Sequence, residues 1–193
     1  MVGQSKIIAI GFQKTGLTSL YMALEILGYK VTTGRQSYKN KITPKKAIKL
    51  LQRKKYSQLF TYLNQYNAVT DNPWNILFEA IDQQFPGSKF IFTYRDEKDW
   101  LSSTKRYFKY RPDTLIRRWV YGVESCLNIT DEQYIKRYRA HNEAVLTYFE
   151  GRNDFLKLNI FEEASWEKLC PFLEKPIIRL PFPHSNKNRI EIK

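Results

Sequence analysis

Short apolar runs alternate along the chain with longer stretches in which apolar residues recur at helical spacing. The runs predict strands at residues 6–11, 29–32, 68–70, 89–94 and 155–159. The helical pattern, with the capping residues and prolines at its boundaries, predicts helices at residues 17–27, 44–55, 56–64, 74–85, 97–108, 112–128, 131–149 and 165–173. The proline-rich stretch 176–193 is predicted to be a largely irregular tail.

This alternation predicts an α/β fold, in which a parallel sheet of about four to five strands is flanked by helices. A chain of 193 residues is long enough to bury one core, so we expect a single domain over residues 1–193. In such sheets, ligands bind beyond the carboxyl ends of the strands. Three candidate motifs lie at predicted strand ends, which makes that edge of the sheet the expected site.

The first motif joins the first strand to the first helix and reads Gly11-Phe12-Gln13-Lys14-Thr15-Gly16-Leu17-Thr18-Ser19. Backbone N–H groups in such a loop point at a bound phosphate, and the helix dipole favours its charge. The spacing is nearly that of a nucleotide-triphosphate P-loop, but Leu17 stands where that motif has lysine, and Lys14 precedes Gly16 by two residues. The pattern predicts a P-loop-like nucleotide-binding core; an ordinary strand-to-helix turn is the alternative.

The second motif begins at the end of the strand predicted over residues 89–94. Arg95 carries a fork of donors that fits a phosphate, and Ser103 follows eight residues later, about two helical turns on. The two side chains can hold one phosphate from two sides, with Asp99 fixing the arginine. Alternatively, Arg95 is tied up at the surface by Asp96 or Asp99.

The third motif follows the strand predicted over residues 68–70. Asp71 comes directly after this strand, and Pro73 is expected just inside a helix that begins at about Trp74. Aspartate is a good helix cap, and a carboxylate at a strand end is also a candidate general base. Both interpretations of Asp71 stay open at this point.

Composition narrows the class of protein. Aromatic residues make up 15% of the chain, which is not the composition of a disordered protein. No apolar run is long enough to span a membrane, the N-terminus does not read as a signal peptide, and Cys126 and Cys170 match no metal-site spacing. A cytoplasmic location is therefore expected.

The net charge of +13 is unevenly distributed. No acidic residue occurs between Glu25 and Asp71, and this interval holds Lys30, Arg35, Lys39, Lys41, Lys45, Lys46, Lys49, Arg53, Lys54 and Lys55. Such a field attracts anions, although a solvated helix face is an equally good interpretation of residues 45–55. A nucleic-acid-binding module would account for the charge, with Tyr38 and Tyr56 as stacking groups, but it leaves the three strand-end motifs unexplained. A P-loop kinase would need a lysine after Gly16 and a carboxylate for magnesium, and neither is found.

Taken together, Lys14-Thr15-Gly16-Leu17-Thr18-Ser19 and the Arg95–Ser103 pair resemble the motifs of the sulfotransferases. The resemblance extends through residues 158–162 and 166–173 to residues 181–186, which are similar to the end of a short, P-loop-like branch of that family. It implies transfer of a sulfuryl group from 3′-phosphoadenosine 5′-phosphosulfate (PAPS), with no metal required. The acceptor would be a small molecule, a carbohydrate or a lipid, including an acidic one.

The resemblance also implies residue roles. Lys14 would act on the leaving group, the N–H groups of residues 15–19 and the Thr18 hydroxyl would hold the 5′-phosphate, and Arg95 with Ser103 would hold the 3′-phosphate. Lys14, Asp71 and Ser103 form the expected catalytic set.

Two departures from the family pattern matter. Asp71 replaces a histidine found in many members. Ser19 stands where small-molecule sulfotransferases often have an aromatic residue that packs on the adenine, so in this respect the chain resembles the carbohydrate-modifying branches. His141 is expected to be a core residue, whereas His184 and Glu79 are the next candidates for the base.

Overall fold

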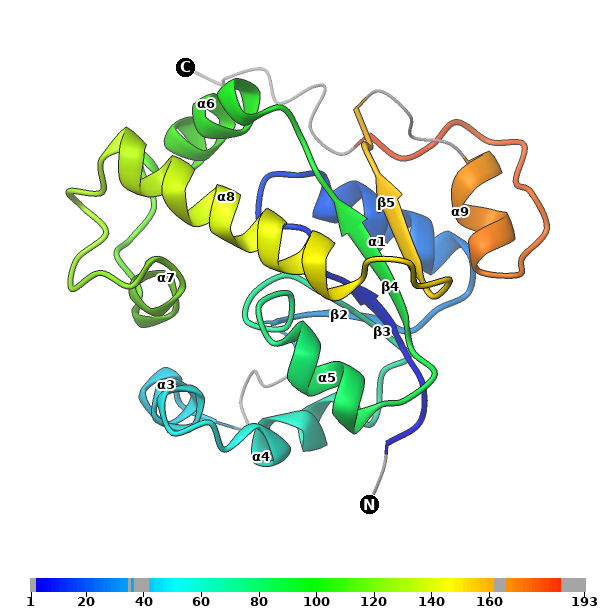
Figure 1. Ribbon diagram of the computed structural model, residues 1–193, viewed down its shortest axis with the longest axis horizontal. Coiled ribbons are helices and arrows are strands. Elements are labelled where there is room, and N and C mark those ends of the chain that lie inside the picture. Colours follow the sequence, from blue (N-terminus) through cyan, green and yellow to red (C-terminus); the bar gives the residue numbers. More distant parts are fainter. Residues whose placement is uncertain (1–2, 35, 37–41, 162–165, 185–193) are drawn as a thin grey trace.

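The computed structural model of the protein describes residues 3–34, 36, 42–161 and 166–184 (Figure 1). Its centre is a five-stranded parallel sheet with the order β2-β3-β1-β4-β5. The strands are β1 (Ile7–Ala9), β2 (Val31–Thr33), β3 (Ala68–Thr70), β4 (Lys89–Thr93) and β5 (Phe155–Leu158). The predicted α/β class and strand number are confirmed, and the bounds of β3 are those expected from the sequence.

Helices cover both faces of the sheet. They are α1 (Leu17–Ile26), α3 (Pro44–Gln52), α4 (Tyr56–Phe60) with the 3-10 turn η1 (Thr61–Leu63), α5 (Phe78–Gln84), α6 (Glu97–Phe108), α7 (Leu115–Tyr121), α8 (Asp131–Tyr148) and α9 (Trp166–Phe172). Figure 1 shows α5 and α8 crossing in front of the sheet, with α1 behind it. The prediction for residues 97–108 matches α6 at both ends.

Alternation along the strands divides the core into two layers. Ile8, Val69 and Phe90 pack against the apolar sides of α3, α4, α5 and α8. Ile7 and Ile91 point the other way and pack against α1 and α9. Successive side chains of a strand face opposite sides of the sheet, so a strand buried on both faces reads as a continuous apolar run.

Two predicted helices begin or end differently in the structure. The helix expected from Trp74 begins only at Phe78, because residues 72–76 form turns instead. The helix expected over residues 112–128 is the shorter α7, which ends at the left-handed Gly122. In the tail, residues 176–184 form no helix or strand, while residues 185–193 lie outside the described part of the chain, as does Ser165, the expected cap of α9.

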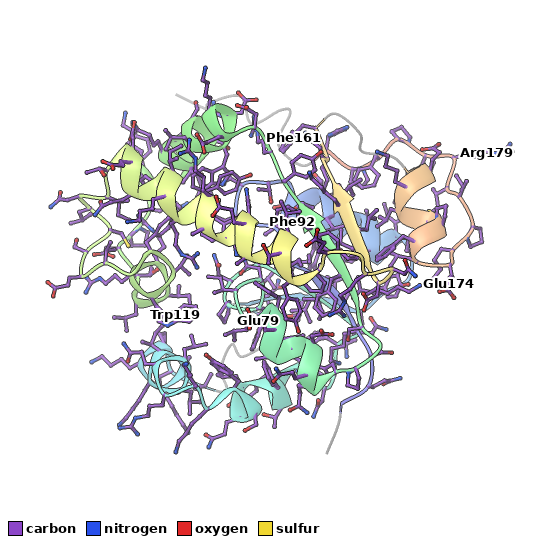
Figure 2. The ribbon with its side chains drawn as sticks, viewed as in Figure 1. Glu79, Phe92, Trp119, Phe161, Glu174 and Arg179 are labelled. Atoms are coloured by element: carbon purple, nitrogen blue, oxygen red, sulfur yellow. The ribbon has the colours of Figure 1, made fainter. Side chains whose placement is uncertain are left out.

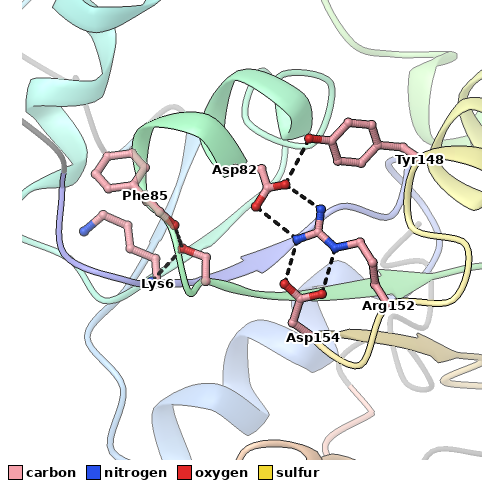
Figure 3. Close-up of polar contacts among 7 residues, drawn as sticks. Lys6, Asp82, Phe85, Tyr148, Arg152 and Asp154 are labelled. Atoms are coloured by element: carbon pink, nitrogen blue, oxygen red, sulfur yellow. Dashed lines mark hydrogen bonds and ion pairs between the residues drawn. The ribbon is translucent and has the colours of Figure 1, made fainter.

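A network of ion pairs joins α5, the end of α8 and the start of β5 (Figure 3). The Arg152 guanidinium donates to Asp82 at 2.6 and 3.1 Å and to Asp154 at 2.9 and 2.6 Å. Tyr148 donates a further hydrogen bond to Asp82 at 2.9 Å. Two bidentate pairs on one arginine thus hold α5 against the turn between α8 and β5, although Asp82 and Arg152 are 70 residues apart in the sequence.

We expect Arg152→Ala to lower the free energy of unfolding by about 2–3 kcal/mol, because it leaves two partly buried carboxylates without their donor. Urea denaturation measures the loss, and Arg179→Ala, which removes an exposed arginine from the tail, is the matched control. The Arg152 guanidinium lowers the pKa of Asp154, so its contribution is complete above the unfolded pKa of about 3.9 and is lost as pH falls through the folded value. A difference between the two proteins that did not shrink in acid would contradict this account.

Candidate active site

Parallel pairing brings the three sequence motifs to one edge of the sheet. β1 lies between β3 and β4, with Ile8 opposite both Val69 and Phe90. The carboxyl ends of these three strands therefore meet, and they lead into Gly11, Asp71 and Arg95. The structure places the motifs together as the strand pattern predicts.

The loop after β1 has the backbone of an anion-binding turn. Lys14 and Gly16 have positive φ angles of 69° and 99°, and α1 begins at Leu17 with no side-chain cap and no acidic residue in its first turn. The first N–H groups of a helix have no partner within it, so those of Leu17 and Thr18 are available to a ligand. A Cβ on Gly16 would lie only 3.0–3.2 Å from Ile160, which is a second reason for glycine at this position.

The floor of the loop is built from hydroxyl contacts. Thr15 donates to the Phe12 carbonyl at 2.5 Å, and its hydroxyl also lies 2.7 Å from that of Thr93 in β4. A Cβ on Gly11 would collide with Thr93, so the two strands approach closely only because Gly11 has none. The Thr15 side chain therefore forms its hydrogen bonds within the fold.

The side chains after Gly16 differ in their surroundings. Leu17 is buried against the core layer of α1 and α9, and the Ser19 side chain is also buried. Thr18 is exposed. The exposed Thr18 therefore offers a side-chain hydroxyl at the start of α1, whereas the buried Ser19 does not.

One side of α6 faces the loop. The Trp100 indole donates to the Gln13 carbonyl at 2.8 Å, and the Lys14 ammonium lies 4.4 Å from the centre of the Tyr107 ring. Ser103 lies between these two aromatic residues on the same side of the helix and is 7% exposed. Asp96 caps α6 by accepting from the N–H groups of Lys98 and Asp99.

Hydrogen bonds fix the backbone of Arg95, whereas one N–H donor of its guanidinium has no partner among the described residues. The Tyr138 hydroxyl donates to the Arg95 carbonyl at 2.9 Å and accepts from its N–H at 3.1 Å. The guanidinium stacks 4.3 Å from the Phe161 ring centre, and Figure 2 shows Phe161 beyond the end of β5. Its ion pair with Asp99 is long, at 3.7 Å, and Asp99 is largely exposed. Within the described residues, the buried Arg95 Nε has no hydrogen-bond partner.

Asp71 lies in a tight turn at the end of β3. Its φ angle is 70°, and its carbonyl accepts from Trp74 at 3.1 Å and Asn75 at 3.4 Å. Burial raises the pKa of the Asp71 carboxyl, and a hydrogen bond from the Asn72 backbone partly opposes this rise. The interpretation of Asp71 as a helix cap is wrong, because α5 begins at Phe78 and its N-cap is Leu77.

The two histidines have different environments. His141 is buried and lies 2.8 Å from the Ile10 carbonyl, as expected for a core residue. Burial lowers the pKa of His141 to about 4, so the ring is neutral and donates to that carbonyl. His184 is exposed in the tail, and Glu79 is exposed in the first turn of α5.

Sequence reasoning missed the residues that hold the loop in place. Gln13 accepts from Asn72 at 3.3 Å and hydrogen-bonds the Tyr121 hydroxyl, linking two of the motif-bearing turns to α7. Trp100 and Tyr107 were also missed, although they stand three residues before and four after Ser103, the spacing of one helix face. From that spacing, the sequence could have indicated that Trp100 and Tyr107 lie on the same side of the helix as Ser103.

The described part of the chain contains neither a membrane-spanning helix nor a metal-binding group of side chains. No helix there is long and apolar enough to cross a membrane. No group of three or more histidine, cysteine, aspartate or glutamate side chains is placed there to hold a metal ion.

Comparisons with known proteins agree with the geometry. A family model described as "Sulfotransferase domain" matches residues 6–190. A curated relative, "Ava biosynthesis cluster protein M" of Aspergillus versicolor, is 24% identical over 93% of this chain and 80% of its own length. Among solved structures, the sulfotransferase STF9 of Mycobacterium avium has a similar fold, with a TM-score of 0.54 and 10% identity over 93% of this chain. The chain covers 66% of that structure, just under two thirds.

We expect Trp100→Phe to loosen the loop. The substitution keeps an aromatic ring against Tyr138, which stacks on Trp100 with centroids 4.1 Å apart, but it removes the donor to Gln13. An unpaired buried carbonyl costs about 1–3 kcal/mol of unfolding free energy, measurable by urea denaturation. The control is Trp119→Phe on α7, because Trp119 packs against the same aromatic cluster as Trp100 but lies on the side of α7 that faces α3 (Figure 2). Equal losses in the two variants would show that the indole donor at Trp100 has no special role.

Proposed function

The chain belongs to the sulfotransferase family, and on that premise we propose that it transfers a sulfuryl group from PAPS to a hydroxyl or amine of an acceptor. The observation that carries the proposal is that α6 packs against the loop after β1. The helix that begins after Arg95 and bears Ser103 also bears Tyr107, whose ring lies against Lys14. This contact supports the proposal that one helix positions both phosphate sites of a nucleotide that carries a 5′- and a 3′-phosphate.

The donor fits the groups that the described residues leave unpaired. The N–H groups of Leu17 and Thr18 at the start of α1 would take the 5′-phosphate, with the Thr18 hydroxyl beside them. The unpartnered Arg95 Nε and the Ser103 hydroxyl would take the 3′-phosphate. Phe161 keeps the guanidinium plane in place by stacking, which lowers the cost of ordering it on binding.

Lys14 and Asp71 would act on the reacting atoms. During in-line transfer, the acceptor oxygen bonds to sulfur while the bond from sulfur to the bridging phosphate oxygen breaks. The Lys14 ammonium neutralises the charge that develops on that oxygen, and the Asp71 carboxylate takes the acceptor proton. A carboxyl whose pKa is raised by burial is better suited to accept a proton than an exposed one.

Family membership favours sulfuryl transfer over the kinase alternative, and Leu17 in the position of the P-loop lysine supports the same choice. The acceptor is proposed as a small molecule, a carbohydrate or a lipid. Its identity would depend on the walls of the site and not on the donor-binding motifs.

We expect the protein to bind 3′-phosphoadenosine 5′-phosphate (PAP) at least about tenfold more tightly than AMP, because a charged hydrogen bond contributes about 1.5–3 kcal/mol. Arg95→Ala should abolish the preference, whereas Arg179→Ala, which removes an equal charge from the exposed tail, should keep it. Titration calorimetry with both nucleotides measures these affinities. Equal binding of PAP and AMP by the wild type would refute the proposed donor.

We expect Asp71→Asn to lower turnover about a hundredfold or more while leaving PAP binding unchanged, because an amide cannot accept the proton. A carboxyl with a raised folded pKa destabilises the fold above that pKa, so the variant should melt at or above the wild-type temperature at pH 7. Wild-type activity should rise as pH increases through the Asp71 pKa, and the residual activity of the variant should lack that step. Full activity in Asp71→Asn would move the base to another residue, with Glu79 and His184 tested next.

A further inference from the structure

The described residues outside the candidate active site include one strongly basic hollow. It lies between α3 and α4 and has a volume of about 560 Å³. Five of its lining side chains are cations, namely Lys45, Lys46, Lys49, Arg53 and Lys55, and none of its lining residues is acidic. The basic stretch of the sequence therefore forms a concave surface here, in which three lysines of α3 lie beside Arg53 and Lys55 of the turn that leads to α4.

The charges of this basic hollow are not compensated. The sequence has no carboxylate between Glu25 and Asp71, and the ion pairs found among the described residues all use other cations. Lys45, Lys49 and Arg53 follow one another at four-residue spacing, which places like charges next to each other on the helix. This arrangement destabilises an empty site and favours one that an anion neutralises.

The helix dipole adds to this cost. Lys45 and Lys46 lie in the first turn of α3, where the dipole favours negative charge, and that turn contains no acidic residue. The helix is nonetheless firmly attached, because Ala47 and Leu51 are buried in the core layer shared with α5 and α8. Thr43 also caps the helix by accepting from Lys46. The cations are thus displayed on a fixed platform.

The basic hollow is separate from the candidate active site. In Figure 1, α3 and α4 lie at the bottom of the molecule, while α6, which carries Ser103, lies at the top. An anion held between α3 and α4 therefore does not contact the loop after β1. We propose that this hollow is a second anion-binding site, which takes a compact soluble polyanion bearing several phosphate or sulfate groups.

Two other occupants fit the observations less well. A single-stranded nucleic acid needs aromatic side chains on which bases stack, and the described lining contains none. An anionic membrane is a broad surface that binds an exposed basic face, whereas these cations surround a concavity the size of a small ligand. Four lysines and one arginine that line one open hollow suit a small molecule with clustered anionic groups.

Titration calorimetry at two salt concentrations tests the proposal with two compact probes, sucrose octasulfate and inositol hexakisphosphate. We expect one of them or both to bind the wild type at one site, and Lys49→Ala/Arg53→Ala to weaken this binding about tenfold or more. The matched control is Lys136→Ala/Arg179→Ala, which removes one lysine and one arginine from exposed positions on α8 and the tail. It should change the affinity by less than about twofold, the effect of net charge alone.

Further measurements separate this site from the nucleotide site. Arg95→Ala should leave polyanion binding unchanged, and saturating PAP should not displace the probe. Displacement by PAP, or equal weakening in both double variants, would overturn the proposal, as would no binding of either probe. Cosedimentation with vesicles containing anionic lipid, in the absence of binding to the soluble probes, would assign the basic hollow to a membrane surface instead. Because Arg95→Ala is measured separately, failure here leaves the proposed donor untouched.

Discussion

The close approach of β1 and β4 at Gly11 and Thr93 is the constraint on which the candidate site depends. Gly11 has no side chain to collide with Thr93, and the Thr15 hydroxyl joins the two strands at 2.7 Å. This contact fixes where the loop after β1 begins and how far it lies from Arg95. If the strands were held further apart, the loop and the arginine would not flank one ligand.

Aromatic packing extends this constraint to α6. Phe12, at the start of the loop, is fully buried among rings from α6, α7 and α8, including Trp100, Tyr121 and Tyr138. Tyr138 also binds both backbone groups of Arg95. One aromatic cluster thus packs against Phe12 of the first motif and fixes the backbone of Arg95 in the second.

Electrostatics is arranged differently in the two basic regions. At the strand edge, each cation is oriented by an aromatic ring, with Lys14 against Tyr107 and Arg95 against Phe161. Around the basic hollow, flexible lysines surround a concavity with no ring in its described lining. A stacked cation is pre-organised for one geometry, whereas a group of lysines adapts to ligands of varied shape. The first arrangement suits a reaction, and the second suits recognition of charge.

The sequence by itself determined the fold class and the approximate strand positions, because the runs at residues 7–10, 68–69 and 90–92 are buried on both faces and so are apolar throughout. The loop after the first strand and the Arg95–Ser103 pair indicated the family. The eight-residue spacing of Arg95 and Ser103 also identified these two residues as a candidate phosphate-binding pair. Only the tertiary structure decided that Asp71 caps no helix, since the turn over residues 71–76 depends on contacts with the loop after β1, such as that of Asn75 with the Gly11 carbonyl. It also decided the supporting roles of Gln13 and Tyr138, whose partners are distant in the sequence. Local patterns encode burial, whereas long-range hydrogen bonds form only once the chain has folded.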